Sequence, residues 1–167
     1  MGMQLIETIE VGAGGASSIE FTGIPQDGVD LVLVYSLRHD SSSDLAGRII
    51  LNGDTTAANY SEIWLLGDNG GVTSASYSAN YLGYSNPDDY TANTFNSGQV
   101  VLSNYTSSSA KTFGTEVVTE NNASAAQALL IAGKWSGISA ITSIEITPNT
   151  ANYKQYSTAS LYKITAD

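Results

Sequence analysis

The sequence contains no cysteine and a single histidine, His39, among its 167 residues. Without cysteine there is no disulfide framework, no thiolate nucleophile and no cysteine-ligated metal, so stability has to come from packing or from the association of copies. Proline and basic residues are also scarce, at three and six respectively. These absences remove many of the residue types on which catalysis depends and favour a protein that acts through its surface and its assembly.

The sequence also has few basic residues. Sixteen acidic residues against six basic ones give a formal net charge of −10, and the basic residues stand singly along the chain. No basic stripe could neutralise successive phosphates, so we expect neither nucleic acid nor an anionic membrane as a partner. No stretch approaches the roughly 20 apolar residues of a membrane helix, and the first residues do not resemble a secretory signal, which predicts a soluble protein made in the cytoplasm.

What the sequence does contain is a series of short runs of Val, Ile, Leu and Tyr, separated by turns of Gly, Asn, Asp and Ser. These runs predict about ten strands, at 5–11, 18–21, 29–38, 46–51, 60–67, 99–102, 111–119, 126–135, 141–147 and 159–164. No alternation of strands with helices is visible. The sequence therefore predicts an all-β fold, a single domain over 1–167 built as an antiparallel β-sandwich or jelly roll.

Three segments carry more specific predictions. The strand at 5–11 is expected to form a hairpin with 18–21 across the glycine-rich turn at 12–15. The density of apolar residues in 29–38 predicts a central strand that is covered on both faces. Residues 72–97 are rich in tyrosine and show no sustained apolar period, which predicts a long loop or insertion.

Candidates for catalysis are few. His39 lies between Arg38 and Asp40, where it could act as a general base, but no Gly-x-Ser-x-Gly elbow supplies a nucleophile. The triplet is more simply the polar end of a buried strand. The glutamates are expected to be solvated on strands or in turns rather than paired in a cleft: Glu7, Glu10, Glu20, Glu62, Glu116, Glu120 and Glu145. The Asn- and Asp-rich turns do not have the spacing of a calcium loop. We therefore assign no catalytic, cofactor-binding or metal-binding residue and expect the protein not to be an enzyme.

Tyrosine is the most informative residue type that is abundant, with ten copies. Tyr77, Tyr81, Tyr84 and Tyr90 all fall in the segment predicted to be a loop. An aromatic ring with a polar tip suits either sugar stacking or a protein interface. These four tyrosines are therefore the candidate contact surface.

Several turn and strand motifs occur together, and they extend over most of the chain: Tyr35-Ser36-Leu37-Arg38, Asn52-Gly53-Asp54, Asn59-Tyr60-Ser61, Asn104-Tyr105-Thr106, Glu120-Asn121-Asn122, Ala132-Gly133-Lys134-Trp135 and Tyr156-Ser157-Thr158. In this combination the chain resembles a group of virion proteins of tailed bacteriophages, frequent in marine and cyanobacterial phages. Many of those proteins end in Leu-Tyr-Gly-Ile, where this chain has Lys163. The shared motifs are turns and strands rather than active-site signatures.

The resemblance implies a jelly-roll structural protein of the virion. Its most specific implication is a capsid decoration, or cement, protein that binds the outer surface of the head, with the major capsid protein as partner and a homotrimer at or near threefold positions. The protein would be made in the host cytoplasm. The alternative is a receptor- or glycan-binding domain of a tail fibre or baseplate, with the four tyrosines as contact surface. A cellular carbohydrate-active enzyme is disfavoured by the few catalytic candidates.

Overall fold

The computed structural model describes residues 2–120 and 126–166. Twelve strands and one short 3-10 helix, η1 (Ala57–Asn59), lie in this part of the chain. The strands form two antiparallel sheets that pack together, so the predicted all-β sandwich is confirmed. None of the described segments forms a helix that is long and apolar enough to cross a bilayer.

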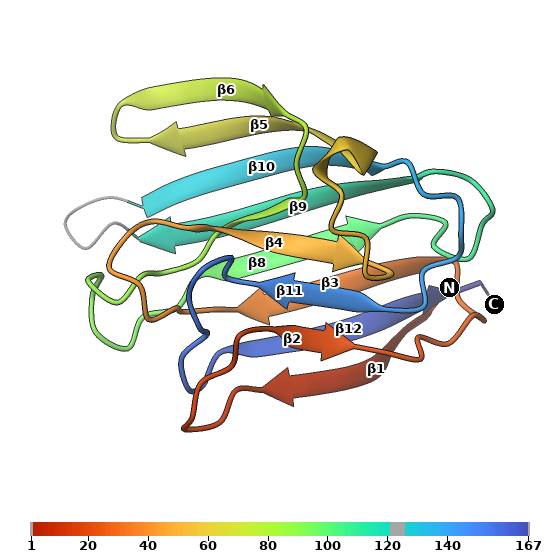
Figure 1. Ribbon diagram of the computed structural model, residues 1–167, viewed down its shortest axis with the longest axis horizontal. Coiled ribbons are helices and arrows are strands. Elements are labelled where there is room, and N and C mark those ends of the chain that lie inside the picture. The colour runs from red at the N-terminus through yellow and green to blue at the C-terminus, as the bar shows by residue number, and fades with distance from the viewer. Residues whose placement is uncertain (1, 121–125, 167) are drawn as a thin grey trace.

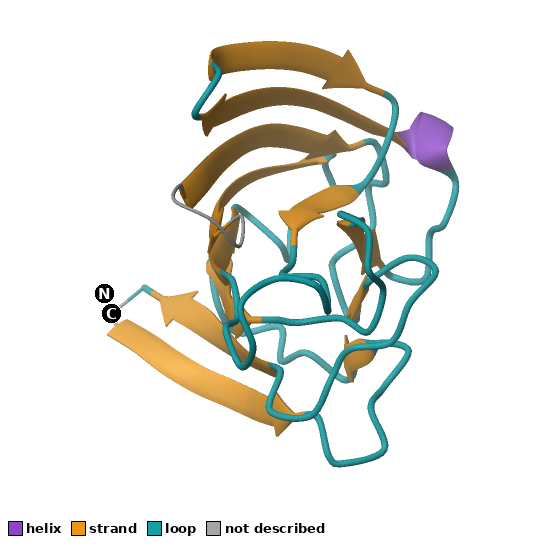
Figure 2. Ribbon diagram, turned by 90° about the vertical axis from the view of Figure 1, so that its left-hand side faces the viewer, coloured by secondary structure: helices purple, strands orange, loops and turns teal. Residues whose placement is uncertain are grey.

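The larger sheet has eight strands in the order β1-β12-β3-β8-β9-β10-β5-β6, and the smaller sheet has four in the order β2-β11-β4-β7. The larger sheet consists of β1 (Gly2–Glu10), β12 (Thr158–Thr165), β3 (Asp30–Ser36), β8 (Ser97–Leu102), β9 (Lys111–Glu120), β10 (Ala126–Trp135), β5 (Tyr60–Asp68) and β6 (Gly71–Tyr77). The smaller sheet consists of β2 (Ile19–Phe21), β11 (Ile144–Thr147), β4 (Ala46–Leu51) and β7 (Tyr81–Tyr84). The larger sheet curves around the smaller one (Figure 1, Figure 2).

The core lies between the two sheets, because alternate residues of each strand point inward. In β9, every odd-numbered residue from Lys111 to Thr119 is buried and the even-numbered ones between them are exposed. Leu33 and Phe113 from the larger sheet belong to the same buried cluster as Ile49 from the smaller sheet. One face of the smaller sheet and one face of the larger sheet are therefore occupied by the core.

The segment 72–97 is not one long loop, so this prediction is wrong in part. It contains most of β6 and all of β7, and only 85–96 connects β7 to β8. Six of the seven residues of β6 are exposed, because β6 is the last strand of its sheet, so its sequence needs no apolar alternation. β7 has four residues, which is too short for a periodic signal.

The predicted N-terminal hairpin is also wrong, because β1 and β2 lie in different sheets. β1 pairs with β12, whereas β2 pairs with β11. The chain crosses between the sheets at Val11, which is buried and forms backbone hydrogen bonds with Tyr156 and Ser157. The crossing leaves β1 as an edge strand and lets Ile19 and Phe21 enter the core from the opposite side.

β3 is a central strand, as predicted, since β12 and β8 pair with its two sides. It is buried on one face only, however. Leu33 and Tyr35 point into the core, whereas Val34 on the other face is 42% exposed. The segment 29–38 is thus rich in apolar residues for two reasons: one face of β3 packs in the core, and its other face belongs to an outer sheet surface that is itself apolar.

Candidate functional site

The outer face of the larger sheet, which points away from the smaller sheet, carries a group of exposed apolar side chains on neighbouring strands. The strand register places them all on the same side of the sheet. We refer to this group as the apolar sheet face, and it consists of Val34, Ile63, Leu65, Val72, Val101, Val118 and Leu130. Their exposed fractions range from 39% at Val101 to 78% at Val72. A contiguous exposed apolar patch is characteristic of interaction surfaces.

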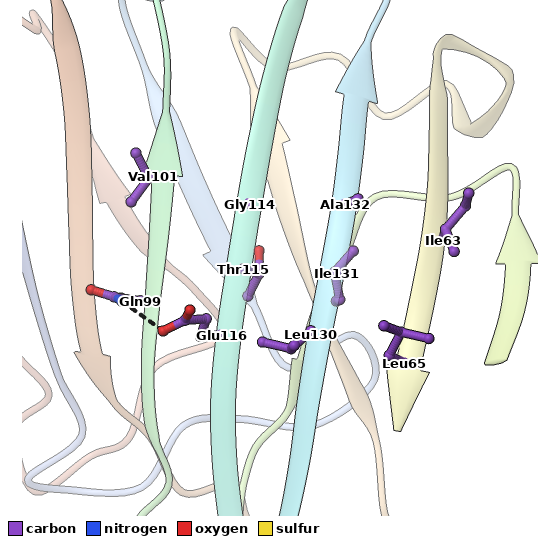
Figure 3. A pocket seen from close by; sticks show the side chains of 10 residues that line it. All are labelled: Ile63, Leu65, Gln99, Val101, Gly114, Thr115, Glu116, Leu130, Ile131 and Ala132. Carbon is purple, nitrogen blue, oxygen red and sulfur yellow. Dashed lines mark hydrogen bonds between the residues drawn. The ribbon is translucent and has the colours of Figure 1, made fainter. Parts of the chain in front are cut away.

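A groove of about 290 Å³ lies at the centre of the apolar sheet face (Figure 3). Val101, Gly114, Ala132 and Ile63 form one cross-strand row over β8, β9, β10 and β5. The two small residues in the middle of this row make the floor, and the larger ones make the sides. A Cβ atom added at Gly114 would have no other atom within 4 Å, so the hollow is open above this residue.

Charge is sparse on the apolar sheet face. Beside the groove, the Glu116 carboxylate accepts a hydrogen bond of 2.8 Å from the side-chain amide of Gln99 (Figure 3). Most of the aspartates lie instead in segments between strands: Asp27, Asp40, Asp44, Asp54, Asp88 and Asp89. Among the described residues, Glu116 is the one charged residue that lines the groove, and most of the aspartates lie on the loops, so burial of the face removes few charges from water.

Three of the four candidate tyrosines come together around Trp64. The ring centroids of Tyr77, Tyr81 and Tyr84 lie 5.1, 4.9 and 5.9 Å from that of Trp64, all in edge-to-face geometry. Trp64 is only 6% exposed, and Tyr81 and Tyr84 are half-buried. Only Tyr77, at 41% exposure, offers a large part of its ring to a partner. The cluster thus joins β5 and β6 of the larger sheet to β7, an end strand of the smaller sheet.

Tyr90 lies apart from this aromatic cluster, in the segment 85–96. Burial, followed by the nearby Asp44 carboxylate, raises the pKa of its phenol. Its backbone carbonyl accepts a hydrogen bond from Arg38. The four tyrosines therefore do not form one exposed platform.

Arg38 organises the segment 85–96, a role that the sequence analysis missed. Its guanidinium is nearly buried, with the residue 4% exposed. Nη1 donates to the carbonyls of Thr91 and Thr94 at 2.8 and 3.0 Å. Nη2 donates to those of Asp88 and Tyr90 at 3.0 and 3.2 Å. The planar fork of donors in arginine suits this convergence of carbonyls, and a lone arginine at the end of an apolar run gave no sign of it.

His39 is fully buried and is not accessible to a substrate from outside. Its Nδ1 accepts a hydrogen bond of 3.3 Å from the backbone N–H of Ser41, and its own backbone N–H donates to the Asn86 carbonyl at 2.9 Å. Burial lowers the pKa of the imidazole, with Asp40 acting in the opposite direction. The triplet is therefore not the end of a buried strand, contrary to the prediction, since β3 ends at Ser36, and Arg38 and His39 instead form isolated bridges with Asn86 and Tyr153. Among the described residues, no three or more His, Asp and Glu side chains are grouped so as to hold a metal ion.

Glu62 is an exception to the expectation that the glutamates are solvated. It is only 3% exposed, because β5 turns Tyr60, Glu62 and Trp64 toward the core. Its Oε2 accepts a hydrogen bond of 3.2 Å from Trp64 Nε1, while its Oε1 has no hydrogen-bond partner in the described part of the chain. Burial raises the pKa of this carboxyl to about 8, although the Trp64 N–H and the Tyr81 backbone lower it in part.

We expect Glu62→Gln to stabilise the fold at pH 8 by about 2 kcal/mol and to leave it nearly unchanged at pH 5. The folded protein holds a proton on Glu62 that the unfolded chain releases above its ordinary pKa of 4.5, so wild-type stability falls as the pH rises from 4.5 to 8. Urea unfolding of both proteins across this range checks the effect, because the titration of His39 cancels in the difference. Parallel stability curves for the two proteins would contradict it.

Comparison with known proteins leaves the family open, because no protein-family model and no curated protein matches the chain.

Proposed function

We propose that this chain is a non-enzymatic structural protein of a tailed-phage virion, namely a decoration protein that binds the outside of the head and stabilises it. The observation that carries the proposal is the apolar sheet face. It joins seven exposed apolar residues on one side of a rigid sheet, around a central groove. Together with the sequence resemblance, it favours attachment to another protein surface over work on a small substrate.

The distribution of charge supports the same direction of docking. A face with little charge can be buried against the major capsid protein, while the acidic loops around it stay in water. A negative outer layer would also keep particles apart in solution. Many copies on one head bind with avidity, so each contact can be small.

The resemblance further leads us to propose a homotrimer at or near the threefold positions of the capsid. In that arrangement each subunit presents its own apolar sheet face to a capsid subunit beneath it. The protein is then found in purified virions, after synthesis in the host cytoplasm.

Leu130→Asp is expected to weaken binding to phage heads at least about tenfold, because it places a charge at the centre of the surface to be buried. Leu130 is 49% exposed, so the fold tolerates the change. Ile138→Asp is the matched control, since Ile138 is 64% exposed and follows β10, outside the apolar sheet face. Co-sedimentation with heads that lack the protein measures both variants, after thermal unfolding has shown that both are folded.

If the two variants bind phage heads equally well, the apolar sheet face is not the surface that binds the head. Immunogold labelling of purified virions tests the location independently: label on the head supports decoration, and label on the tail contradicts it.

A glycan-binding domain of a tail fibre or baseplate is the second candidate, and the exposed ring of Tyr77 favours it. Tyr77 is backed by Tyr81 at 5.5 Å, and Arg48 lies over the Tyr81 ring at 4.6 Å, so a cation and an aromatic surface are adjacent. Such a surface can stack on a sugar ring. Glycan binding by the wild type that is lost in Tyr77→Ala, with label on the tail, would favour this candidate over decoration.

A further inference from the structure

The two edges of the larger sheet differ in how they are protected. Edge strands expose unpaired backbone N–H and C=O groups, and natural sheets block them with charges, prolines or bulges. β1 at one edge has a register shift between Leu5 and Glu7, and it carries exposed Glu7 and Glu10. The register shift and the two carboxylates therefore disfavour pairing of this edge with another strand.

β6 at the other edge has none of these protections. Its seven residues, Gly71–Tyr77, include no charged residue and no proline, and its pairing with β5 runs without a register shift. Six of the seven residues are exposed. Figure 1 shows β6 as the outermost strand of the sheet, above β5 (Figure 1). An edge that has no bulge, no charge and no covering segment is suited to accept a further strand.

The sequence of β6 is compatible with itself as that further strand. All strand pairs of the sheet are antiparallel, and a two-fold axis perpendicular to the sheet continues this order between two copies. With the axis beside Ser74, Val72 lies opposite Ser76 of the second copy, and Gly71 lies opposite its Tyr77. No charge opposes a like charge in this register.

The same pairing also extends the surface described above. Val72 on β6 pairs with Gly67 on β5, on the outer face of the sheet, in the cross-strand row that continues through Ala128 to Val118. The two-fold axis keeps this outer face on the same side in both copies. Two apolar sheet faces thereby become one continuous surface.

We propose that β6 pairs antiparallel with β6 of a second copy of this chain, which joins the two larger sheets into one. This contact uses the β6 edge and involves only Val72 of the apolar sheet face, so it is compatible with a threefold contact elsewhere. Either alone or combined with a trimer, it gives an even number of copies. The inference does not depend on the decoration role.

A charge-swap experiment tests the pairing. Ser74→Lys and Ser74→Glu each place like charges opposite one another in the paired form, and each is expected to weaken self-association at least about tenfold. An equimolar mixture of the two variants places opposite charges together and is expected to restore the association. Thr8→Lys on the exposed β1 edge is the control and leaves the association unchanged. Sedimentation velocity over a range of concentrations measures all five samples.

Several results would overturn the inference: a wild-type protein that is monomeric at every concentration, an assembly that both single variants leave intact, or a mixture that fails to re-associate. Thermal unfolding shows whether the Ser74 variants keep their fold, as expected for an exposed side chain. Head binding of the same variants is scored separately. If the Ser74 variants lose self-association but still bind heads, the result supports the edge contact. If only Leu130→Asp loses head binding, the result supports the decoration role and does not bear on the edge contact.

Discussion

Arg38→Met is expected to lower the free energy of unfolding by about 4 kcal/mol. Methionine fills much of the same volume but donates no hydrogen bond, so four backbone carbonyls in the segment 85–96 lose the guanidinium as a donor, while that of Thr91 keeps Thr94 as another donor. The Asp88 carboxylate, 3.7 Å from Nη2, also loses a positive neighbour. Urea unfolding at neutral pH measures the loss.

Arg48→Met is the matched control for this variant. Arg48 is half-buried, donates one hydrogen bond of 3.1 Å to Asn80 and lies over the Tyr81 ring, so we expect a loss of about 1 kcal/mol. Similar losses in the two variants would show that Arg38 does not organise the segment 85–96. Arg38→Lys separates charge from geometry, since a lysine keeps the charge but cannot donate in the same planar fork.

Gly98→Val is expected to cost about 3 kcal/mol of stability, because the position has no room for a side chain. A Cβ atom at residue 98 would lie 2.3 Å from the Cε2 and Cζ atoms of Tyr35. The Tyr35 ring cannot easily move away, since it is buried and its hydroxyl donates a hydrogen bond of 3.0 Å to the Leu82 carbonyl. Thermal and urea unfolding measure the effect.

Gly114→Val provides the comparison on the neighbouring strand β9. The same substitution there meets open space in the groove, and valine favours a strand, so stability is expected to change by less than about 0.5 kcal/mol. A loss at residue 114 as large as that at residue 98 would contradict this account. Because the variant fills the groove without disturbing the core, it also serves as a second probe of head binding.

The sequence resemblance and the apolar sheet face support the decoration role from different directions. The resemblance rests on turns and strands, whereas the face concerns side chains that the fold leaves outside. The β6 edge adds a proposed contact between copies of the chain, which neither the resemblance nor the apolar sheet face predicts. The experiments above test the three separately: particle binding, residue-level disruption of the face, and charge swapping at the edge.

The candidate contact surface was predictable only in part. The four tyrosines stood out by their residue type, but their shared position in a supposed loop was misleading. Tyr77 and Tyr81 flank a reversal between two strands, which brings them to Trp64 on β5, while Tyr90 lies beyond β7 in a segment held by Arg38. The sequence did not predict the apolar sheet face, for a related reason. Apolar residues in β3 predicted a covered strand, and nothing in a single strand shows which of its two faces meets the core.

The sequence by itself determined the all-β class and the approximate positions of most strands, because side-chain alternation and turn chemistry act over a few residues. Only the tertiary structure decided which strands pair, that Glu62 points inward, and that the large sheet ends in an unprotected strand. These features depend on contacts between distant parts of the chain. Arg38 shows the reason most clearly: the four carbonyls that satisfy it lie 50 to 56 residues away, and only folding brings them to it.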